Sequence, residues 1–479
     1  MQGLSKFLTV ALLVASSAMS PQSLRQPRPR PRPRPRQAPP TSHVAIHIPS
    51  FSGIGVTSCT TASSTTRQSG TGAVTTTVVH VGTKRGKLKK VTWTDADTLN
   101  EPPSVEDVHD ANAQALKPYP IYSIMHLPGN ENSNSSNHCA EEESSGESIL
   151  CGGGDRYITV WEKQKEPGKQ EKQWRIKSQL GPHTGWVKAL AYYSYSSRTR
   201  TRTLFSIGCN CIEIWTDPEF NNAWQHVRKL QIESCPNMGA TLSSDLLCLA
   251  TTYNDDDYNS DDSDSDSSSH PDPAFLFAGG VDGRIHKWAI HQSFDCRGAV
   301  SAHDGRVNEI VVCKNLKVLV SIGNDATVQC RDMTDDDSPF ETWAVTTVNL
   351  KKETEFMRDE DDDDDDDADA DADESSSSSS SSLLRTVSLC VVRGDTKTTT
   401  IAVGTTSGVV LLIDMYRSET GGLNAKILKD HVLKLEDGGI LHALDCCQVS
   451  TNEKGNGNGN YRIIGGHSNG LSVWDISLP

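Results

Sequence analysis

The sequence lacks the short motifs through which many enzymes hold phosphates, metals or nucleophiles. Among its 479 residues there is no Walker-type phosphate loop, no HExxH zinc motif and no GxSxG nucleophile turn. The glycine run Gly152–Gly154 lies between two β-type runs and does not open a helix, so it does not predict a dinucleotide site. We therefore predict no catalytic residue, no cofactor and no bound metal ion.

Paired cysteine ligands are missing as well, although the chain has 13 cysteines. None belongs to a CxxC pair or stands at zinc spacing from a histidine, and several lie in apolar runs: Cys248, Cys313, Cys330 and Cys390. This distribution is typical of small buried side chains in a reducing compartment. It does not indicate a metal site or a disulfide framework.

Long hydrophobic runs are missing after the first 18 residues. The run Phe7–Ala18 follows Lys6 and ends in small residues, and it is too short to cross a bilayer. We interpret residues 1–18 as a secretory signal peptide. Because no other stretch is long and apolar enough, we expect no stable membrane insertion once this leader is removed.

Acidic residues are absent from the first 94 residues, which hold 13 Lys and Arg, while the whole chain has a formal net charge of −16. Alternating Pro and Arg at 27–36 precede a Ser/Thr-rich stretch, and we predict that residues 19–73 form a disordered leader segment. Together with the signal peptide, this segment resembles the bipartite leaders of proteins imported into plastids with extra membranes. The resemblance implies a plastid location, and the alternatives are the secretory pathway and the cytosol or nucleus.

What the chain does contain is a repeat. In FLFAGGVDGRIHKWAI at 275–290, two β-type runs flank a turn with Asp-Gly, the dipeptide that tight hairpins favour. The same layout recurs at 148–162, 204–217, 319–333, 401–415 and 462–476. The copies place the following residues at a common position of their last run: Trp161, Trp215, Trp288, Arg331, Ile413 and Trp474.

A Gly-rich turn with Asp, followed by alternating apolar residues that end in Trp-Asp, resembles the WD-repeat β-propeller family over residues 118–479. The resemblance implies an all-β fold in which each repeat supplies a four-stranded blade. We expect six recognisable blades within a propeller domain at 74–479. A strand around Lys89–Thr94 is expected to complete the last blade; if residues 42–93 form more than one strand, they make a seventh blade.

The family resemblance also implies a polar network within each blade. It joins a His before the first strand, a Ser or Thr on the second, the Asp of the turn and the Trp of the third, because buried polar groups must be paired. No repeat has all four residues. The positions that match are Asp155 and Trp161; His183, Ser206 and Trp215; Asp282 and Trp288; His303, Ser321 and Asp325; and Trp474 followed by Asp475.

Two insertions between the repeated runs are strongly polar. Residues 254–273 contain eight Asp, and residues 353–382 contain an unbroken Asp run and eight consecutive Ser. Low hydrophobicity with high like charge predicts that both insertions are disordered. Ser260 and Ser263 precede acidic residues and are candidate phosphorylation sites.

We interpret the chain as a monomeric propeller that acts as a noncatalytic scaffold for a protein partner of unknown identity. One alternative is a nucleic-acid-associated factor whose Pro-Arg segment contacts phosphate groups. A second alternative is an enzyme with a site at the mouth of the propeller channel, which requires titratable groups that converge there.

Overall fold

The structure is a computed structural model that describes the following residues: 45–48, 55–69, 72–94, 103–108, 119–127, 147–165, 172–194, 201–218, 222–232, 245–252, 274–290, 294–335, 338–352, 384–436, 439–449 and 459–478.

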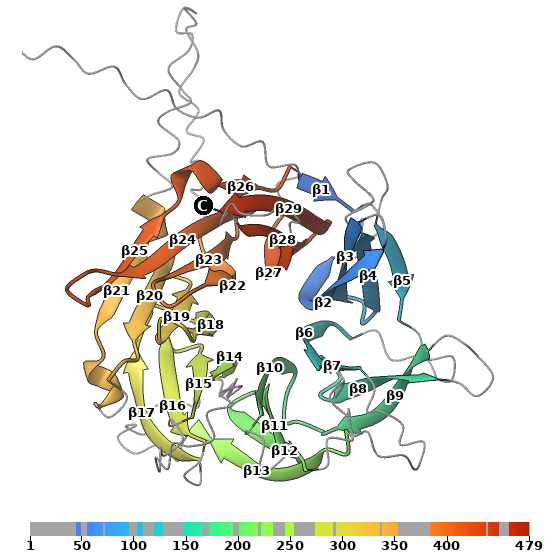
Figure 1. The fold of residues 1–479 in the computed structure, drawn as a ribbon. Coiled ribbons are helices and arrows are strands. Elements are labelled where there is room, and N and C mark those ends of the chain that lie inside the picture. Colours follow the sequence, from blue (N-terminus) through green and yellow to red (C-terminus); the bar gives the residue numbers. More distant parts are fainter. Residues whose placement is uncertain are drawn as a thin grey trace, which may run out of the picture. The chain divides into compact units, whose positions relative to one another are not determined.

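The described chain is almost entirely β-structure, and its strands form seven antiparallel sheets arranged in a ring (Figure 1). Each sheet is one blade, in which neighbouring strands run antiparallel and the first strand lies nearest the centre of the ring. The protein is therefore a seven-bladed β-propeller, which confirms the predicted all-β propeller fold.

The blades are numbered here in chain order. Blade 1 contains β2 (Val56–Ser69), β3 (Gly72–Thr83), β4 (Leu88–Thr94) and β5 (Ser104–Asp107), and blade 2 contains β6 (Ile121–Leu127), β7 (Ser148–Gly153), β8 (Ile158–Lys165) and β9 (Lys172–Leu180). Blade 3 contains β10 (Val187–Ser194), β11 (Arg202–Gly208), β12 (Cys211–Asp217) and β13 (Gln225–Gln231), and blade 4 contains β14 (Leu246–Thr251), β15 (Phe275–Gly280), β16 (Arg284–Ala289) and β17 (Asp295–Ser301). Blade 5 contains β18 (Val307–Cys313), β19 (Val318–Gly323), β20 (Thr327–Asp332) and β21 (Val345–Asn349). Blade 6 contains β22 (Thr386–Gly394), β23 (Thr398–Thr405), β24 (Val409–Arg417) and β25 (Leu423–Ile427), and the short β26 (Leu433–Lys434) pairs with β24. Blade 7 contains β27 (Leu441–Val449), β28 (Gly459–His467), β29 (Gly470–Leu478) and β1 (Ala45–His47). Two short 3-10 turns, η3 (Phe340–Thr342) and η4 (Lys429–His431), lie in connections.

The repeat register predicted from the sequence is confirmed by the strand assignments. The six residues at the common position, from Trp161 to Trp474, all lie on the third strand of their blades. The Asp-Gly turn that anchors the pattern joins β15 to β16, and Gly283 there has φ +77°, a left-handed conformation that favours glycine.

The hydrophobic core lies between blades rather than within one. Seven clusters of buried residues each combine side chains from two neighbouring blades, so every blade contributes to two clusters. Trp288 of blade 4, for example, packs in one cluster with Phe205 of blade 3. A single four-stranded blade buries only part of its apolar surface, and the ring is stabilised when neighbours cover the remainder.

Blade 7 is completed by β1, the first described strand. Ala45 pairs with Trp474 and His47 pairs with Ser472, so the two ends of the ring meet in one sheet. The prediction that Lys89–Thr94 closes this blade is wrong, because β4 lies in blade 1, between β3 and β5, and both of its edges are paired. The alternative of a seventh blade is confirmed.

The predicted start of the propeller at residue 74 is also wrong. The ring begins at Ala45, and β2 and part of β3 fall within residues that were assigned to the disordered leader. The Ser/Thr-rich composition misled this prediction, because threonine favours strands as well as polar linkers. Residues 1–44 lie outside the described chain, so the signal peptide and the Pro-Arg segment remain predictions.

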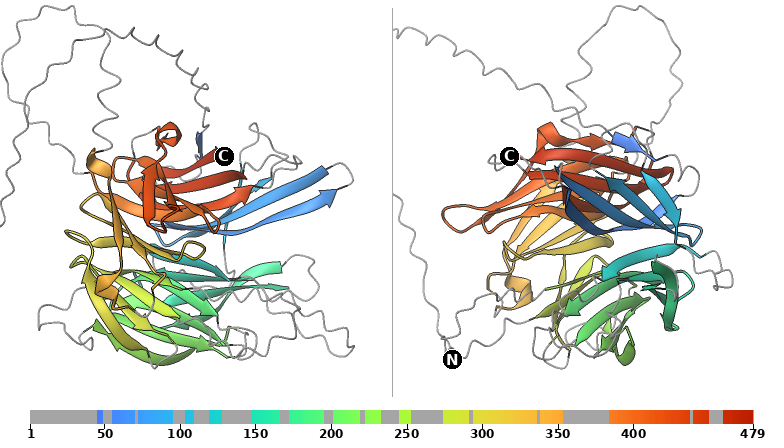
Figure 2. Two further views of the ribbon diagram at one scale, coloured as in Figure 1. Left: turned by 60° about the vertical axis from the view of Figure 1, so that its left-hand side comes forward. Right: turned by 45° about the vertical axis from the view of Figure 1, so that its right-hand side comes forward.

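Blade 1 differs from the other blades in the length of its first two strands. β2 has 14 residues and β3 has 12, but β3 pairs with β4 only from Thr76 onwards. The remaining part of the hairpin is two-stranded, and it projects beyond the ring in the turned view (Figure 2).

Two further expectations concern membranes and cysteines. Within the described residues, no helix has the length and apolar character needed to cross a membrane. Ten of the described cysteines are free thiols, whereas Cys296 is disulfide-bonded, contrary to the expectation that the cysteines form no disulfide.

Candidate functional site

In blade 3, three of the four positions of the predicted polar network lie in contact. His183 Nε2 lies 2.8 Å from the Ser206 hydroxyl, and Trp215 donates its indole N–H to the same hydroxyl at 3.0 Å. His183 and Ser206 are buried, and burial lowers the pKa of His183. The turn of this blade has no Asp, and His183 instead lies 3.1 Å from the carbonyl of Arg156 in blade 2.

The network of blade 5 forms without tryptophan. His303 contacts the Ser321 hydroxyl at 2.9 Å and the Asp325 carboxylate at 3.1 Å, and hydrogen bonds from His303 hold the pKa of Asp325 at about 2. Arg331, which replaces the Trp, is buried beside Phe340 and donates to Gln329 at 3.0 Å. The repeat positions named in blades 3 and 5 therefore lie in contact with one another.

The other matched positions do not form such networks. Asp155 accepts from the backbone of Tyr157 at 3.2 Å, and Asp282 accepts from the backbone of Arg284 at 3.1 Å, so each carboxylate orders only its own turn. Trp161 and Trp288 are buried, and Trp288 stacks on His286 with ring centroids 5.7 Å apart.

In blade 7, tryptophan acts by packing. An added Cβ on Gly465 would lie 2.7 Å from the ring of Trp474, so the ring fits only against glycine. Asp475 binds the guanidinium of Arg462 through two contacts of 2.7 and 2.9 Å. The sequence did not predict His467, which contacts Ser472 at 3.1 Å within the same blade. Ser260, Ser263 and both acidic insertions lie outside the described residues.

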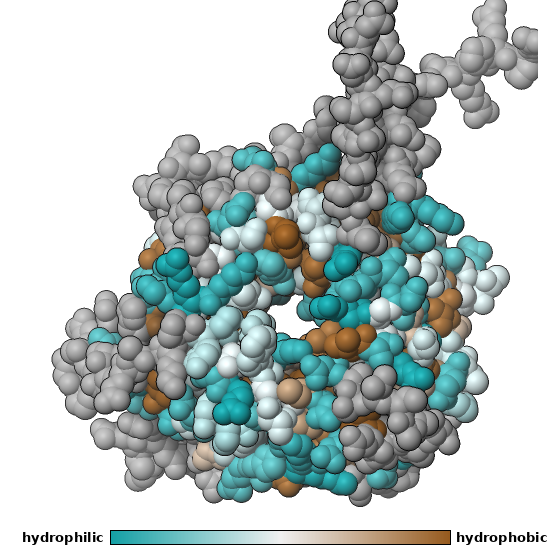
Figure 3. All heavy atoms as spheres, turned by 180° about the vertical axis from the view of Figure 1, so that it is seen from behind, coloured by the Kyte–Doolittle hydropathy of each residue, from teal (hydrophilic) through white to brown (hydrophobic). Residues whose placement is uncertain are grey.

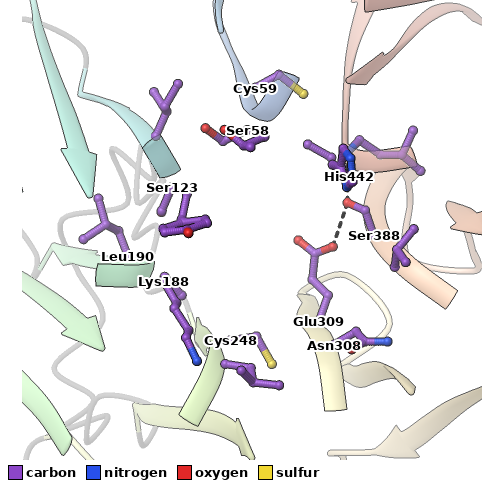
Figure 4. Close-up of a pocket in the computed structure, with 18 of the residues that line it drawn as sticks. Ser58, Cys59, Ser123, Lys188, Leu190, Cys248, Asn308, Glu309, Ser388 and His442 are labelled. Carbon is purple, nitrogen blue, oxygen red and sulfur yellow. Dashed lines mark hydrogen bonds between the residues drawn. The ribbon is translucent and has the colours of Figure 1, made fainter. Parts of the chain in front are cut away.

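The first strands of all seven blades enclose a central cavity of about 270 Å³. Polar groups predominate on its wall, and Figure 4 shows several of them directed toward the open centre. The polar and ionisable side chains that line it are Thr57, Ser58, Cys59, Tyr122, Ser123, Lys188, Cys248, Asn308, Glu309, Ser388 and His442. Leucines and other aliphatic residues complete the wall.

Glu309, on β18, supplies a carboxylate to this cavity. One carboxylate oxygen accepts from the Ser388 hydroxyl at 2.8 Å and from the backbone N–H of Leu389 at 2.6 Å. Burial raises the pKa of Glu309 to about 7, with a further contribution from the negative charge of Asp445. The two hydrogen bonds favour the charged form but do not offset the loss of solvation.

Asp445, on β27, is a second carboxyl group of the inner strands. It accepts hydrogen bonds from the backbone of Thr61 in blade 1 and of Cys446, while burial raises its pKa. Ser388 in blade 6 also accepts from the backbone of Leu444 in blade 7 at 2.9 Å. Polar side chains therefore connect blades 5, 6, 7 and 1 around the cavity wall.

Lys188 and His442 are the basic side chains among the described residues that line the cavity. The Lys188 ammonium lies 3.7 Å from the Asp245 carboxylate, and burial lowers the pKa of His442 to about 4. Among the described residues, Glu309, Asp445 and His442 make no hydrogen bond to one another. The close set of titratable groups required by the enzyme alternative is thus not found there, and these residues form no metal-ligating group.

One feature of the sequence points to the cavity. Glu309 interrupts the apolar strand Val307–Cys313, and its side chain faces the cavity. A carboxylate in an inner strand requires either a partner or access to water, so such an interruption points toward a channel. Identifying the facing residues requires the ring itself, because Ser388 and Asp445 lie 79 and more positions away in the chain.

One face of the ring, termed the turn face, contains the connections that precede each first strand and the turns between second and third strands. Antiparallel pairing places both sets at the same end of every blade, and backbone hydrogen bonds join them, as from Ser468 to Ile440 at 3.0 Å. Of the seven large hydrophobic residues that are exposed in the described chain, four belong to this face: Tyr119, Trp186, Val281 and Ile440.

Trp186 connects the turn face with the cavity. Its side chain is 55% exposed and stacks on Tyr122, a cavity-lining residue, with ring centroids 5.6 Å apart. Figure 3 shows that the ring is open at its centre and that hydrophobic and hydrophilic residues border the opening on the face drawn. The cavity and its surroundings therefore form the best-defined candidate site of the described chain.

Comparison with known proteins adds no relative to this description, since no protein-family model matches the sequence and no curated protein is significantly similar to it.

Proposed function

We propose that the propeller is a noncatalytic scaffold that binds another protein through its turn face. A β-propeller is typical of interaction scaffolds, because rigid blades present loops that vary without disturbing the core. The observation that carries the proposal is the exposure of Trp186 at the edge of the channel. Exposed tryptophan is favoured at protein interfaces, where it contributes a large rigid contact area.

The turn face also indicates the chemistry of the partner. Lys84, Arg85 and Lys87 are exposed in the turn between β3 and β4. The backbone N–H of Lys84 donates to the carbonyl of Gly55, and Gly55 packs against the backbone of Ser468. The backbone N–H of Ser468 in turn donates to the carbonyl of Ile440. Apolar side chains thus lie next to positive charge, and we expect a partner segment that combines apolar and acidic residues.

Affinity capture with turn-face variants tests this proposal. Trp186→Ser together with Ile440→Ser should lose bound proteins that the unmodified chain captures. Val227→Ser is the matched control, because Val227 is also 55% exposed but lies on the outer strand β13. If the double variant and the control retain the same proteins, the turn face is not the binding surface.

We also propose that the chain is related to the WD-repeat family. The local networks around His183 and His303 support this part of the proposal. We also propose that residues 1–44 direct the protein to a plastid, on the basis of composition alone. Sequencing the mature N-terminus tests the leader: a first residue near position 19 supports signal cleavage, and an intact Met1 contradicts it. The nucleic-acid alternative rests on the Pro-Arg segment, and no contact of the described residues favours it.

A further inference from the structure

Glu309 presents an unused acceptor to the central cavity. Ser388 and the backbone of Leu389 both donate to one oxygen, Oε2. Among the described residues, the other oxygen accepts no hydrogen bond, and Figure 4 shows it directed toward the open centre. The ordered strand β18 holds this oxygen in place, so the cavity contains a preoriented acceptor.

Among the described residues, no positively charged group neutralises this carboxylate. Within the described part of the chain Glu309 forms no ion pair. The ionisable groups that face it from other inner strands are the Asp445 carboxyl and the thiols of Cys59, Cys248 and Cys390, all of which are neutral or acidic. Lys188 and His442 line the cavity too, but Lys188 pairs with Asp245 and the pKa of His442 is lowered by burial. A carboxylate in such surroundings is stabilised when a cation enters.

We propose that the channel binds a primary ammonium group through Glu309. An ammonium group is a compact charge with three donors. The cavity offers it the free oxygen of Glu309. Ser58 and Ser123 add polar side chains to other parts of the wall, where Ser58 donates to the carbonyl of Ile121 at 3.0 Å.

The same geometry argues against a guanidinium group. A guanidinium binds a carboxylate best through two parallel hydrogen bonds, one to each oxygen. Ser388 and Leu389 already occupy Oε2, so Glu309 offers a single oxygen. A compact ammonium group needs only that oxygen.

The size of the cavity limits the ligand to a small amine or one side chain. About 270 Å³ is less than the ~300 to 1,000 Å³ typical of pockets for drug-sized molecules. Leu190, Leu249 and Ile124 line the wall and would contact the methylene groups of an alkyl chain. The ammonium group could belong to a free amine or to a lysine of a bound protein, and only the second source rests on the scaffold function proposed above.

Calorimetric titration with n-butylammonium tests the proposal directly. We expect saturable binding at pH 8 and about tenfold weaker binding at pH 6, because a group with a pKa of about 7 is mostly ionised at the higher pH and mostly protonated at the lower. n-Butylguanidinium should bind at least tenfold more weakly, and n-butanol should give no saturable heat.

Glu309→Gln should abolish butylammonium binding, while Glu213→Gln should retain it. Glu213 is a fair control, because it is also largely buried but lies on the third strand of blade 3, where it contacts His226. Circular dichroism melting curves establish that both variants are folded. Equal heats for the unmodified chain and Glu309→Gln at pH 8, or equal affinity for the guanidinium probe, would overturn the proposal.

A second titration distinguishes the two sources of the ammonium group. N-acetyl-lysine methylamide, which carries the lysine side chain, is compared with butylammonium. If it binds and Glu309→Gln also weakens partner capture, the ligand is a partner's lysine. If butylammonium alone binds and capture is unchanged, the ligand is a free amine. If neither amine binds but partner capture still depends on Trp186, the ammonium site is refuted and the scaffold function is retained.

Discussion

Blade 5 holds two carboxyl groups in neighbouring regions, and both accept hydrogen bonds. Asp325 lies on the turn face, and Glu309 lies on the channel wall. Their acidities nevertheless move in opposite directions, since the pKa of Asp325 falls to about 2 and that of Glu309 rises to about 7. Asp325 faces a histidine and lies near the surface. Glu309 faces hydroxyl, thiol and carboxyl groups in the interior of the ring.

The contrast shows that hydrogen bonding alone does not determine the charge state of a partly buried carboxyl group. Asp325 also accepts from the backbone of Asp304 and from Thr327, and its partners can each donate to a negative oxygen. Glu309 has two donors as well, yet the loss of water outweighs them because no positively charged group of the described chain favours its ionised form. The turn face therefore holds its carboxylate ionised, whereas the channel favours the protonated form.

The largest expected effect comes from Glu309→Gln. The folded-state pKa of about 7 exceeds the ordinary value of 4.5, so the native state loses stability as pH rises from 4.5 to 7. The neutral amide lacks this loss, and at pH 8 the variant should be more stable by up to about 3 kcal/mol, the equivalent of the pKa difference. Urea unfolding between pH 4.5 and pH 8 measures it. Parallel pH profiles for the two proteins would contradict the assignment.

Asp325→Ala should act in the opposite sense. It removes a partner of the buried His303, which should cost about 1 to 3 kcal/mol at pH 7. Because the folded-state pKa is depressed, this contribution is complete above the ordinary value of 3.8 and disappears as pH falls through about 2. Chemical unfolding at pH 7 and pH 2.5 should show a smaller difference at the lower pH. Asp335→Ala, in an exposed connection, is the control.

Ser388→Ala should have a moderate effect on the channel side of the comparison. The variant loses the donor to Glu309 and the acceptor for the backbone of Leu444, at a cost of about 1 kcal/mol. Since that donor favours the ionised form of Glu309, its removal should raise the pKa further. The pH midpoint of the stability difference between this variant and its Glu309→Gln derivative should therefore move above 7, and an unchanged midpoint would show that Ser388 does not hold the carboxylate.

Asp282→Ala should have the smallest effect, although Asp282 holds the turn position of blade 4 that Asp325 holds in blade 5. Its carboxylate is exposed and bonds only the backbone of Arg284, so the stability should change by no more than about 0.5 kcal/mol. Differential scanning calorimetry of the Asp282 and Asp325 variants compares the two positions directly. Equal losses of stability would mean that an Asp in this turn stabilises its blade without a histidine partner.

Local patterns in the sequence predicted much of the fold. The Asp-Gly turn and the alternating run that ends in Trp288 define a hairpin by short-range chemistry, and their recurrence implies stacked units. Blade 1 escaped this reasoning because the turn between its second and third strands, Lys84–Lys87, contains no Asp-Gly, and the strand that follows it contains no Trp-Asp pair. The closing strand Ala45–His47 escaped it because three residues carry no detectable period.

The candidate site could not be predicted in the same way. Each network around a histidine joins residues within one repeat or its edge, so spacing reveals it, as for His303 and Asp325. The channel joins side chains from seven different repeats, and the distance between Ser58 and Glu309 along the chain contains no information about their approach. What brings them together is ring closure, which depends on packing between blades.

The pairing of β1 with β29 gives the ring a single seam, made of three residues that belong to the amino-terminal end of the described chain. Any trimming that stops before residue 45 leaves this seam intact, whereas a cut after His47 detaches the outer strand of blade 7 and exposes the edge of β29. The position at which a protease cleaves therefore determines whether β1 remains paired with β29. Without β1, the ring is no longer closed by this pairing, and the unpaired edge of β29 can pair with a strand of another chain.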